Sequence, residues 1–100
     1  MAAYLIFELG QVADAAAIGE YVERGPAIVQ QYGGRYLARG QQAEVVEGDH
    51  PPCAMVLIEF PSMAQLKAFY DSPEYTPLRQ LRQRAMSGTF LMLEGVGNSF

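Results

Sequence analysis

The segment AMVLIEF, residues 54–60, is the most apolar stretch of the chain and constrains its fold more than any other feature. It follows the loop GDHPP, in which a glycine and two prolines exclude regular structure. A short apolar run of this kind is typical of a strand in the interior of a sheet. Its apolar part, Ala54 to Ile58, is far shorter than the roughly 20 residues of a membrane-spanning helix. We therefore expect a β-sheet protein that does not contact a membrane.

Strand and helix signals precede this segment. Residues 4–9 (YLIFEL) are rich in strand formers and predict a first strand. Asp14 is a suitable N-cap for a following helix, which Gly33 ends. Pro26 lies inside this helix, and because proline lacks an amide donor we expect a kink or break at residues 22–25. The apolar positions of the helix are Ile18, Tyr21, Val22, Val29 and Tyr32.

Two further strands are predicted around Gly40, at residues 34–39 and at residues 43–47 (AEVVE). After the central strand, Ser62 and Gln65 form a capping-box pattern that begins a second helix. The prolines of the segment DSPEYTP interrupt that helix, which then resumes until Gly88. The resumed helix has its apolar positions at Leu78, Leu81 and Ala85, and a last strand follows at residues 89–94 (TFLMLE).

This order of elements predicts one α+β domain over residues 1–100. A chain of 100 residues that is 50% hydrophobic has the size and composition of one ordinary domain. The economical topology is a ferredoxin-like βαββαβ sandwich, an antiparallel sheet with both helices on one face. The other face of the sheet then stays uncovered, and we expect it to contact a second copy of the chain in a homodimer.

Alternation along the strands assigns residues to the two faces of the sheet. The face expected against the helices consists of Leu5, Phe7, Leu9, Tyr36, Ala38, Val56, Ile58, Phe60, Leu91 and Leu93. The face expected against a second subunit consists of Tyr4, Ile6, Glu8, Arg35, Leu37, Arg39, Met55, Leu57, Glu59, Phe90, Met92 and Glu94. On that second face the arginines and carboxylates have the chemistry to pair.

Charge and cysteine content exclude several classes of function. The formal net charge of −4 opposes general nucleic-acid binding, which requires a positive field. The single Cys53 forms no disulfide within the chain and supplies no paired zinc ligands, so we expect no metal and no cofactor. No basic flank followed by an apolar segment begins the sequence, and we expect a cytoplasmic protein.

The segment YGGRYLARG, residues 32–40, combines glycines with basic residues but does not match a phosphate-binding loop. Such a loop follows a strand and precedes a helix. Here a predicted helix precedes Gly33 and a predicted strand follows Gly34. The glycines therefore end the helix and reverse the chain.

The arginines leave structural and ligand-binding interpretations open. Arg35 and Arg39 are four residues apart on a predicted strand and should share a face, where they could bind an anionic substrate or pair with Glu8, Glu59 or Glu94. The basic residues of the last predicted helix are most simply surface charges near its carboxyl end. They are Arg79, Arg82 and Arg84.

His50 and the tyrosines are the other candidates for chemistry. His50 is the only histidine, and its ordinary pKa near neutrality suits a general acid or base. Loose metal binding by His50 with Glu47, Asp49 and Cys53 is a weaker alternative. Tyrosines such as Tyr36 and Tyr75 serve as proton donors or line an aromatic pocket, although core packing is their commoner role.

Four segments resemble the bacterial domain-of-unknown-function family thirteen-thirty. They are YGGRYLARG, EVVEGD, IEFPS and FYDSPEYTPLRQLR, in the same order along nearly the whole chain. The resemblance implies a ferredoxin-like fold and a homodimer in which two sheets face one another as a dimeric α/β barrel. The positions that match the recurrent polar pattern of the family are Tyr32, Arg35, Tyr36, Arg39, Glu44, Glu59, Ser62, Tyr70, Tyr75 and Arg79.

Three positions depart from the pattern of that family. Gln41 stands where a glycine is usual, His50 where a tryptophan is frequent, and Ala54 where an arginine is common. If the usual tryptophan or arginine helps to bind the ligand of the family, we expect this chain to bind a different ligand or none, and the expected fold does not change. The wider superfamily implied by the resemblance includes cofactor-independent monooxygenases, muconolactone-type isomerases and haem enzymes, so the fold alone does not select an activity.

Two functional hypotheses follow. The first is a metal-independent enzyme of monooxygenase, isomerase or cyclase type that acts on a small aromatic or otherwise conjugated organic acid. Its candidate catalytic residues are His50, Glu59, Tyr36 and Tyr75, and its candidate substrate-binding residues are Arg39, Arg35, Tyr32 and Arg79. The second is a noncatalytic ligand-binding or accessory dimer in which these residues are structural. A haem enzyme is a third, weaker alternative.

Overall fold

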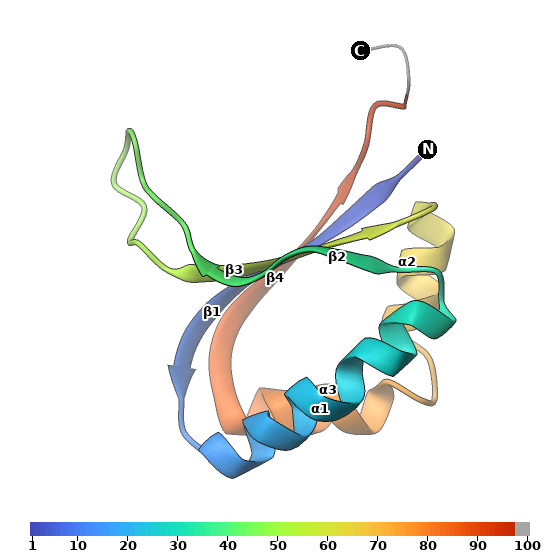
Figure 1. Ribbon diagram of the computed structural model, residues 1–100, viewed down its shortest axis with the longest axis horizontal. Coiled ribbons are helices and arrows are strands. Elements are labelled where there is room, and N and C mark those ends of the chain that lie inside the picture. The colour runs from blue at the N-terminus through green and yellow to red at the C-terminus, as the bar shows by residue number, and fades with distance from the viewer. Residues whose placement is uncertain (98–100) are drawn as a thin grey trace.

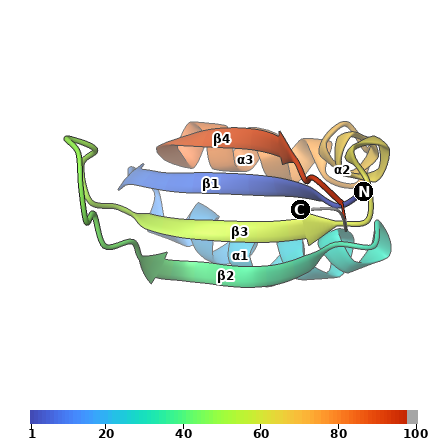
Figure 2. The ribbon, with the colours of Figure 1, turned by 90° about the horizontal axis from the view of Figure 1, so that it is seen from above.

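The computed structural model describes residues 1–97 and consists of one four-stranded sheet with helices on one face (Figures 1 and 2). The elements are β1 (Ala3–Val12), α1 (Ala15–Gln31), β2 (Arg35–Gln42), β3 (Ala54–Phe60), α2 (Met63–Tyr70), α3 (Thr76–Ala85) and β4 (Met86–Glu94). The strand order is β2-β3-β1-β4, and all neighbouring strands are antiparallel. The predicted ferredoxin-like βαββαβ topology, with its second helix in two pieces, is confirmed.

The predicted capping residues begin the helices. The side chain of Asp14 accepts a hydrogen bond from the amide of Ala17, and that of Ser62 accepts one from the amide of Gln65. Between α2 and α3, the hydroxyl of Ser72 accepts from the amide of Tyr75. Asp14 and Ser62 pair amides that a first helical turn leaves without partners, which fixes where α1 and α2 start, whereas Ser72 stabilises the turn before α3.

Helix α1 continues through Pro26, so the expected break at residues 22–25 does not occur. Proline removes the hydrogen bond that its amide would donate to the carbonyl four residues earlier, here Val22. In this structure Nη2 of Arg39, on β2, donates to that carbonyl oxygen over 3.2 Å. A side chain from the neighbouring strand therefore supplies a partner that the helix itself lacks.

The prediction of a strand at residues 43–47 is wrong. Strand β2 runs only to Gln42, and the loop that follows projects beyond the sheet (Figure 1). Pairing with β3 ends where the amide of Ala43 donates to the carbonyl of Cys53. Pro51 and Pro52 have no amide donors to extend the ladder, and Val46 is 88% exposed. Strand β4 also begins earlier than expected, at Met86.

Strand β2 contains a β-bulge that changes which face Arg39 occupies. The cross-strand pairs on either side of it are Arg35–Glu59, Tyr36–Ile58, Ala38–Leu57 and Arg39–Val56. Leu37 is thus an extra residue, and beyond it the alternation is inverted. The predictions that Arg39 shares a face with Arg35 and that Ala38 faces the helices are wrong. A second register shift follows at Gly40, whose φ of 90° favours glycine.

The two faces of β4 are also opposite to those expected. Leu91 lies opposite Ile6, and Leu93 opposite Tyr4, which places both leucines on the uncovered face of the sheet. Phe90 instead lies opposite Phe7, on the helical face, with 4.2 Å between the ring centroids. Both faces of TFLMLE are apolar, so alternation separates the two sets without telling which one faces the helices.

The hydrophobic core lies between the sheet and the helices. Its buried residues are Ala3, Leu5, Val29, Ile58, Phe60, Leu66, Phe69, Tyr75 and Leu78. The helices leave the opposite face uncovered, and Figure 2 looks onto that face. As predicted, Tyr4, Ile6, Glu8, Arg35, Met55, Leu57 and Glu59 belong to it.

Candidate functional site

A cavity of about 220 Å³ lies between α1 and the helical face of the sheet. Strands β1 and β3 supply its apolar floor, whereas α1 forms the opposite wall and packs mainly against α3. The residues that line it are Leu5, Phe7, Leu9, Tyr21, Val22, Gly25, Pro26, Val29, Tyr36, Arg39, Gly40, Val56, Ile58, Phe69, Tyr75 and Phe90. The cavity is therefore largely apolar and aromatic, with three tyrosine hydroxyls and one guanidinium as its polar groups.

Tyr21 of α1 and Tyr75, the N-cap of α3, are joined through their hydroxyl oxygens over 2.6 Å. Tyr75 is only 1% exposed, and its ring stacks against Phe69 with centroids 4.3 Å apart. Burial raises the pKa of Tyr21 far above its ordinary value, and the neighbouring Tyr75 raises it further. Burial also raises the pKa of Tyr75, although the hydrogen bond to Tyr21 and the charge of Arg82 oppose this shift. Both groups are therefore protonated at neutral pH.

Tyr36 and Arg39 lie together toward the β2 side of the cavity. The guanidinium carbon of Arg39 is 4.9 Å from the centroid of the Tyr36 ring, a cation–π distance. Burial raises the pKa of Tyr36, and the charge of Arg39 opposes that shift. Arg39 is exposed, and its guanidinium donates one hydrogen bond, to the carbonyl oxygen of Val22. Because a guanidinium carries five N–H donors, Arg39 retains donors for an anion at the mouth of the cavity.

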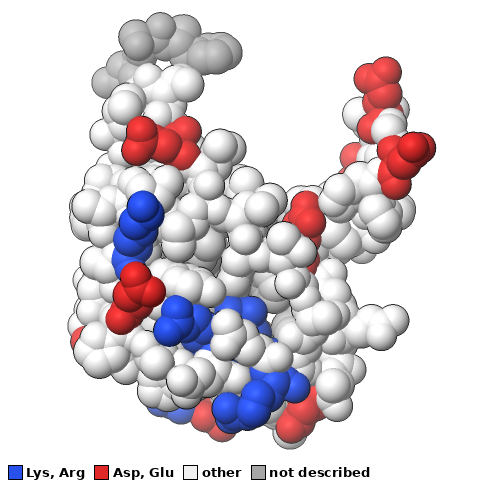
Figure 3. Space-filling model, turned by 180° about the vertical axis from the view of Figure 1, so that it is seen from behind, with Lys and Arg blue, Asp and Glu red and all other residues white. Residues whose placement is uncertain are grey.

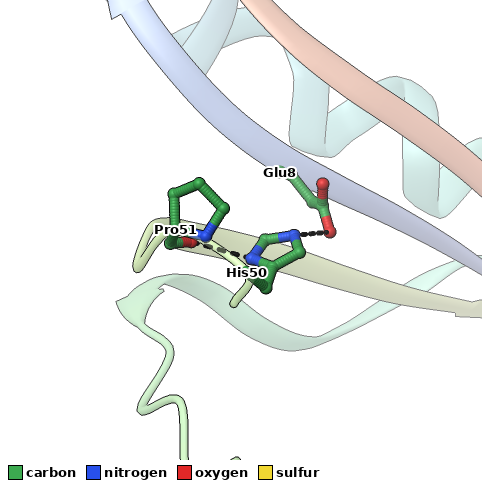
Figure 4. Close-up of polar contacts among 3 residues, drawn as sticks. All are labelled: Glu8, His50 and Pro51. Carbon is green, nitrogen blue, oxygen red and sulfur yellow. Dashed lines mark hydrogen bonds and ion pairs between the residues drawn. The ribbon is translucent and has the colours of Figure 1, made fainter. Parts of the chain in front are cut away.

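His50 and Glu59 lie on the uncovered side of the sheet, away from this cavity. His50, in the loop before β3, forms a hydrogen bond of 3.1 Å between its Nε2 and Oε2 of Glu8, and its Nδ1 is 2.7 Å from the carbonyl oxygen of Pro51 (Figure 4). Nε of Arg35 donates to Oε1 of Glu59 over 2.7 Å. None of these groups lines the cavity.

Tyr32 and Arg79 lie at the surface near the α2–α3 junction. The hydroxyl of Tyr32 donates to Oε1 of Glu74 over 2.8 Å, and this hydrogen bond raises the pKa of Tyr32. Arg79 lies 3.6 Å from a carboxylate oxygen of Asp71, and its guanidinium carbon lies 4.7 Å from the ring centroid of Tyr70. Of the residues proposed from the sequence, the structure thus brings Tyr36, Tyr75 and Arg39 together in one cavity.

Sequence reasoning missed two residues near this cavity, Tyr21 and Arg82. The sequence places Tyr21 on the apolar face of its helix and among the tyrosines that can line a pocket or pack in the core, but does not single it out as a site residue. The expectation that Arg82 is a surface charge is wrong, because the residue is 5% exposed. The signal was its spacing: Arg82 follows Leu78 by four residues and precedes Ala85 by three, which places all three on one helical face.

Figure 3 shows the side of the molecule where basic side chains gather in the helical half, apart from the acidic side chains of the projecting loop.

Among residues 1–97, no three His, Cys, Asp or Glu side chains are grouped so that they could hold a metal ion. In the same part of the chain, no helix has the length and apolarity needed to cross a membrane.

Solved structures of low sequence identity share this fold. A protein of unknown function from Rhodopseudomonas palustris has a TM-score of 0.71 and 18% identity, over 96% of this chain and 84% of that one. SnoaB, a cofactor-independent oxygenase from Streptomyces nogalater, has a TM-score of 0.66 and 8% identity, over 98% and 96%. A dimeric ferredoxin-like protein of unknown function from Jannaschia sp. has a TM-score of 0.62 and 14% identity, over 95% and 100%.

These likenesses define the class: the chain has the α+β fold of the dimeric ferredoxin-like proteins. Within that class, it belongs to the family described as Domain of unknown function (DUF1330), whose model matches residues 2–96. The resemblance noted from the four sequence segments is thereby confirmed. No curated protein sequence is significantly similar to the chain.

Proposed function

We propose that the protein is a homodimer whose cavities each bind a small aromatic or conjugated organic acid, and that it is a metal-independent enzyme of monooxygenase, isomerase or cyclase type. The observation that carries this proposal is the cavity between α1 and the sheet, which combines apolar walls with tyrosine hydroxyls and Arg39. A cavity of this composition buries an aromatic ring while a few polar groups fix its orientation.

The size and charge of the cavity define its ligand class. About 220 Å³ is below the roughly 300–1,000 Å³ of typical ligand pockets, which favours a molecule with a single ring. Arg39 offers a planar donor edge to a carboxylate at the mouth. Tyr36, beneath that guanidinium, adds an aromatic face for the ring of the ligand.

The reaction that this cavity supports best is one in which negative charge develops on a ligand oxygen. Buried, protonated tyrosines donate hydrogen bonds to such an oxygen and need little reorganisation as the charge forms. The structural likeness to SnoaB, a cofactor-independent oxygenase, is compatible with this chemistry at the level of fold.

A noncatalytic ligand-binding dimer is the second candidate, and one observation favours it. The described residues that line the cavity include no carboxylate and no imidazole. The cavity therefore lacks the side chains that commonly act as general bases near neutral pH. If this alternative holds, bound aromatic acids are recovered unchanged after long incubation in air, as mass spectrometry would show.

The binding proposal is tested with single-ring aromatic carboxylic acids and their neutral amides, titrated while chemical shifts of the protein are followed. We expect the acids to bind with shifts at residues of the cavity, and the amides to bind at least tenfold more weakly. Arg39→Gln should remove this preference for the acid, whereas Arg35→Gln, on the same strand but on the uncovered face, should not. Equal binding of acids and amides, or shifts confined to the uncovered face, would refute the proposal.

A further inference from the structure

Arg82 of α3 is a buried cation with unused hydrogen-bond donors. The residue is 5% exposed, and none of the described carboxylates forms an ion pair with it. Its Nε and Nη2 atoms are buried, and among residues 1–97 they have no hydrogen-bond partner. Because a buried charged group without partners costs free energy, an acceptor from outside the chain would stabilise Arg82.

Two aromatic rings contact the guanidinium of Arg82 without accepting its hydrogen bonds. The guanidinium carbon lies 4.0 Å from the ring centroid of Phe90 and 5.3 Å from that of Phe7. These cation–π contacts offset part of the cost of removing the charge from water. The Nε–H and one Nη2–H point the same way from one edge of the planar group, and two oxygens of a single anion match such an edge.

Arg82 also lines a groove of about 450 Å³ between the end of α3 and the first half of β4. Tyr70, Gln83 and Ser87 are its other residues with polar side chains, and among the described residues no carboxylate lines it. The Oγ of Ser87 accepts a hydrogen bond from the amide of Gln11 over 2.9 Å, so its own proton is not used in that bond. The groove therefore combines one buried cation with several neutral donors.

A second guanidinium lies beside this groove. The guanidinium carbon of Arg79 is 4.7 Å from the ring centroid of Tyr70. Its ion pair with the exposed Asp71 is 3.6 Å long, and such a pair neutralises little of the charge. Two positive charges and several donors favour a phosphate group, which carries about −1.5 to −2 at pH 7 and offers more oxygens than a carboxylate.

We propose that the groove between α3 and β4 is a phosphate-binding site in which Arg82 is the principal binding residue. The Nε–Nη2 edge turns toward the groove and binds two oxygens of the phosphate, and Gln83 and Ser87 donate to the others. This site is additional to the cavity beside α1, because Arg82 is not among the residues that line that cavity. The proposed function and this inference therefore stand or fall separately.

The probe is inorganic phosphate, compared with chloride at equal ionic strength, while the Nε–H resonance of Arg82 is followed. We expect phosphate to shift this resonance to saturation and to raise the midpoint of thermal unfolding, since a ligand that binds only the native state stabilises it. Arg82→Lys retains the charge without the two-donor edge, and should weaken phosphate binding by about tenfold or more.

Two further variants keep the test decisive if Arg82→Lys does not fold. Ser87→Ala, at an exposed position of the groove, should weaken phosphate binding about three- to tenfold, the range that one hydrogen bond gives. Arg84→Gln is the matched control, because it removes an exposed positive charge from the same helix outside the groove. Its affinity for phosphate should equal that of the wild type.

The source of the phosphate and the failure of the inference have separate readouts. Tighter binding of glycerol phosphate than of inorganic phosphate would identify an organic phosphate as the ligand, and the reverse would identify the free anion. The inference is overturned if phosphate shifts the Arg82 resonance no more than chloride does, which would leave water as the partner of the buried donors. It is also overturned if acetate binds more tightly than phosphate, or if Arg84→Gln weakens binding as much as Arg82→Lys.

Discussion

Tyr21 and Tyr75 connect two helices through one short hydrogen bond, and their burial controls their ionisation. A phenolate in an apolar cavity loses hydration without gaining an equivalent partner, so burial raises the pKa of both groups. In an unfolded chain, tyrosine titrates near pH 10. Through these two tyrosines, the folded and unfolded states therefore bind different numbers of protons only in alkaline solution.

This difference predicts how stability depends on pH. Below about pH 10 both states keep these protons and the stabilisation is complete, whereas above it the unfolded chain loses protons that the folded chain retains. We expect the free energy of unfolding to fall by up to about 1.4 kcal/mol per pH unit for each such tyrosine. Tyr21→Phe should remove about one such contribution to the slope.

Urea denaturation between pH 8 and pH 11 measures this slope. The control is ultraviolet titration of the chain in concentrated urea, where all 6 tyrosines should ionise together near pH 10. A native protein whose tyrosines all ionise in that same step would contradict the burial of Tyr21 and Tyr75.

At the scale of elements, α1 and β2 depend on one another through Pro26 and Arg39. Pro26 leaves the carbonyl of Val22 without its helical donor, and the bulge at Leu37 turns Arg39 to the face from which it reaches that carbonyl. Arg39 therefore has a structural contact as well as its proposed role at the mouth of the cavity.

A double-mutant cycle separates the structural contact. Arg39→Ala should cost about 0.5–1.5 kcal/mol of unfolding free energy in the wild-type background. In a Pro26→Ala background the cost should be smaller, because the alanine amide supplies the helical donor to Val22. The measurement is chemical denaturation of the four proteins.

Arg35→Ala, on the same strand but paired with Glu59, serves as control and should cost the same unfolding free energy in both backgrounds. A cost of Arg39→Ala that does not depend on residue 26 would contradict the contact between Arg39 and Val22.

Local sequence signals predict some features of these elements and miss others. Capping residues and apolar periodicity were sufficient for the presence and order of the helices, the interior strand and the topology, since each signal is local, but the expected break in α1 was wrong. The face of Arg39 was not predictable, because a one-residue bulge inverts alternation without a sequence signature. Which face of the sheet Leu91 and Phe90 occupy depends on how β4 pairs with β1. The segment TFLMLE is apolar on both faces, so its polarity does not predict this. The cavity brings together Tyr21, Tyr36 and Tyr75 from three elements, and only the folded chain makes these residues neighbours.

At the scale of the whole molecule, the uncovered face of the sheet accounts for the proposed homodimer. Leu91 is 45% exposed and Leu93 is 57% exposed, and Tyr4, Ile6 and Leu57 lie on the same face. Apolar surface of this kind on an isolated domain favours association. A twofold axis places each residue of the face in the interface twice, so one substitution acts at two symmetric positions.

The homodimer is tested by introducing a charge into this face. We expect wild-type protein to scatter light as a dimer at micromolar concentration and Leu91→Glu to scatter as a monomer. Burying one leucine contributes about 1.5–3 kcal/mol, and the symmetric interface contains two copies of it.

Ala16→Glu adds the same charge at the exposed start of α1 and should leave the dimer unchanged. Circular dichroism should show that the Leu91→Glu monomer is folded, since Leu91 lies outside the core between sheet and helices. A wild-type monomer, or a Leu91→Glu dimer of unaltered affinity, would show that this face is not the interface.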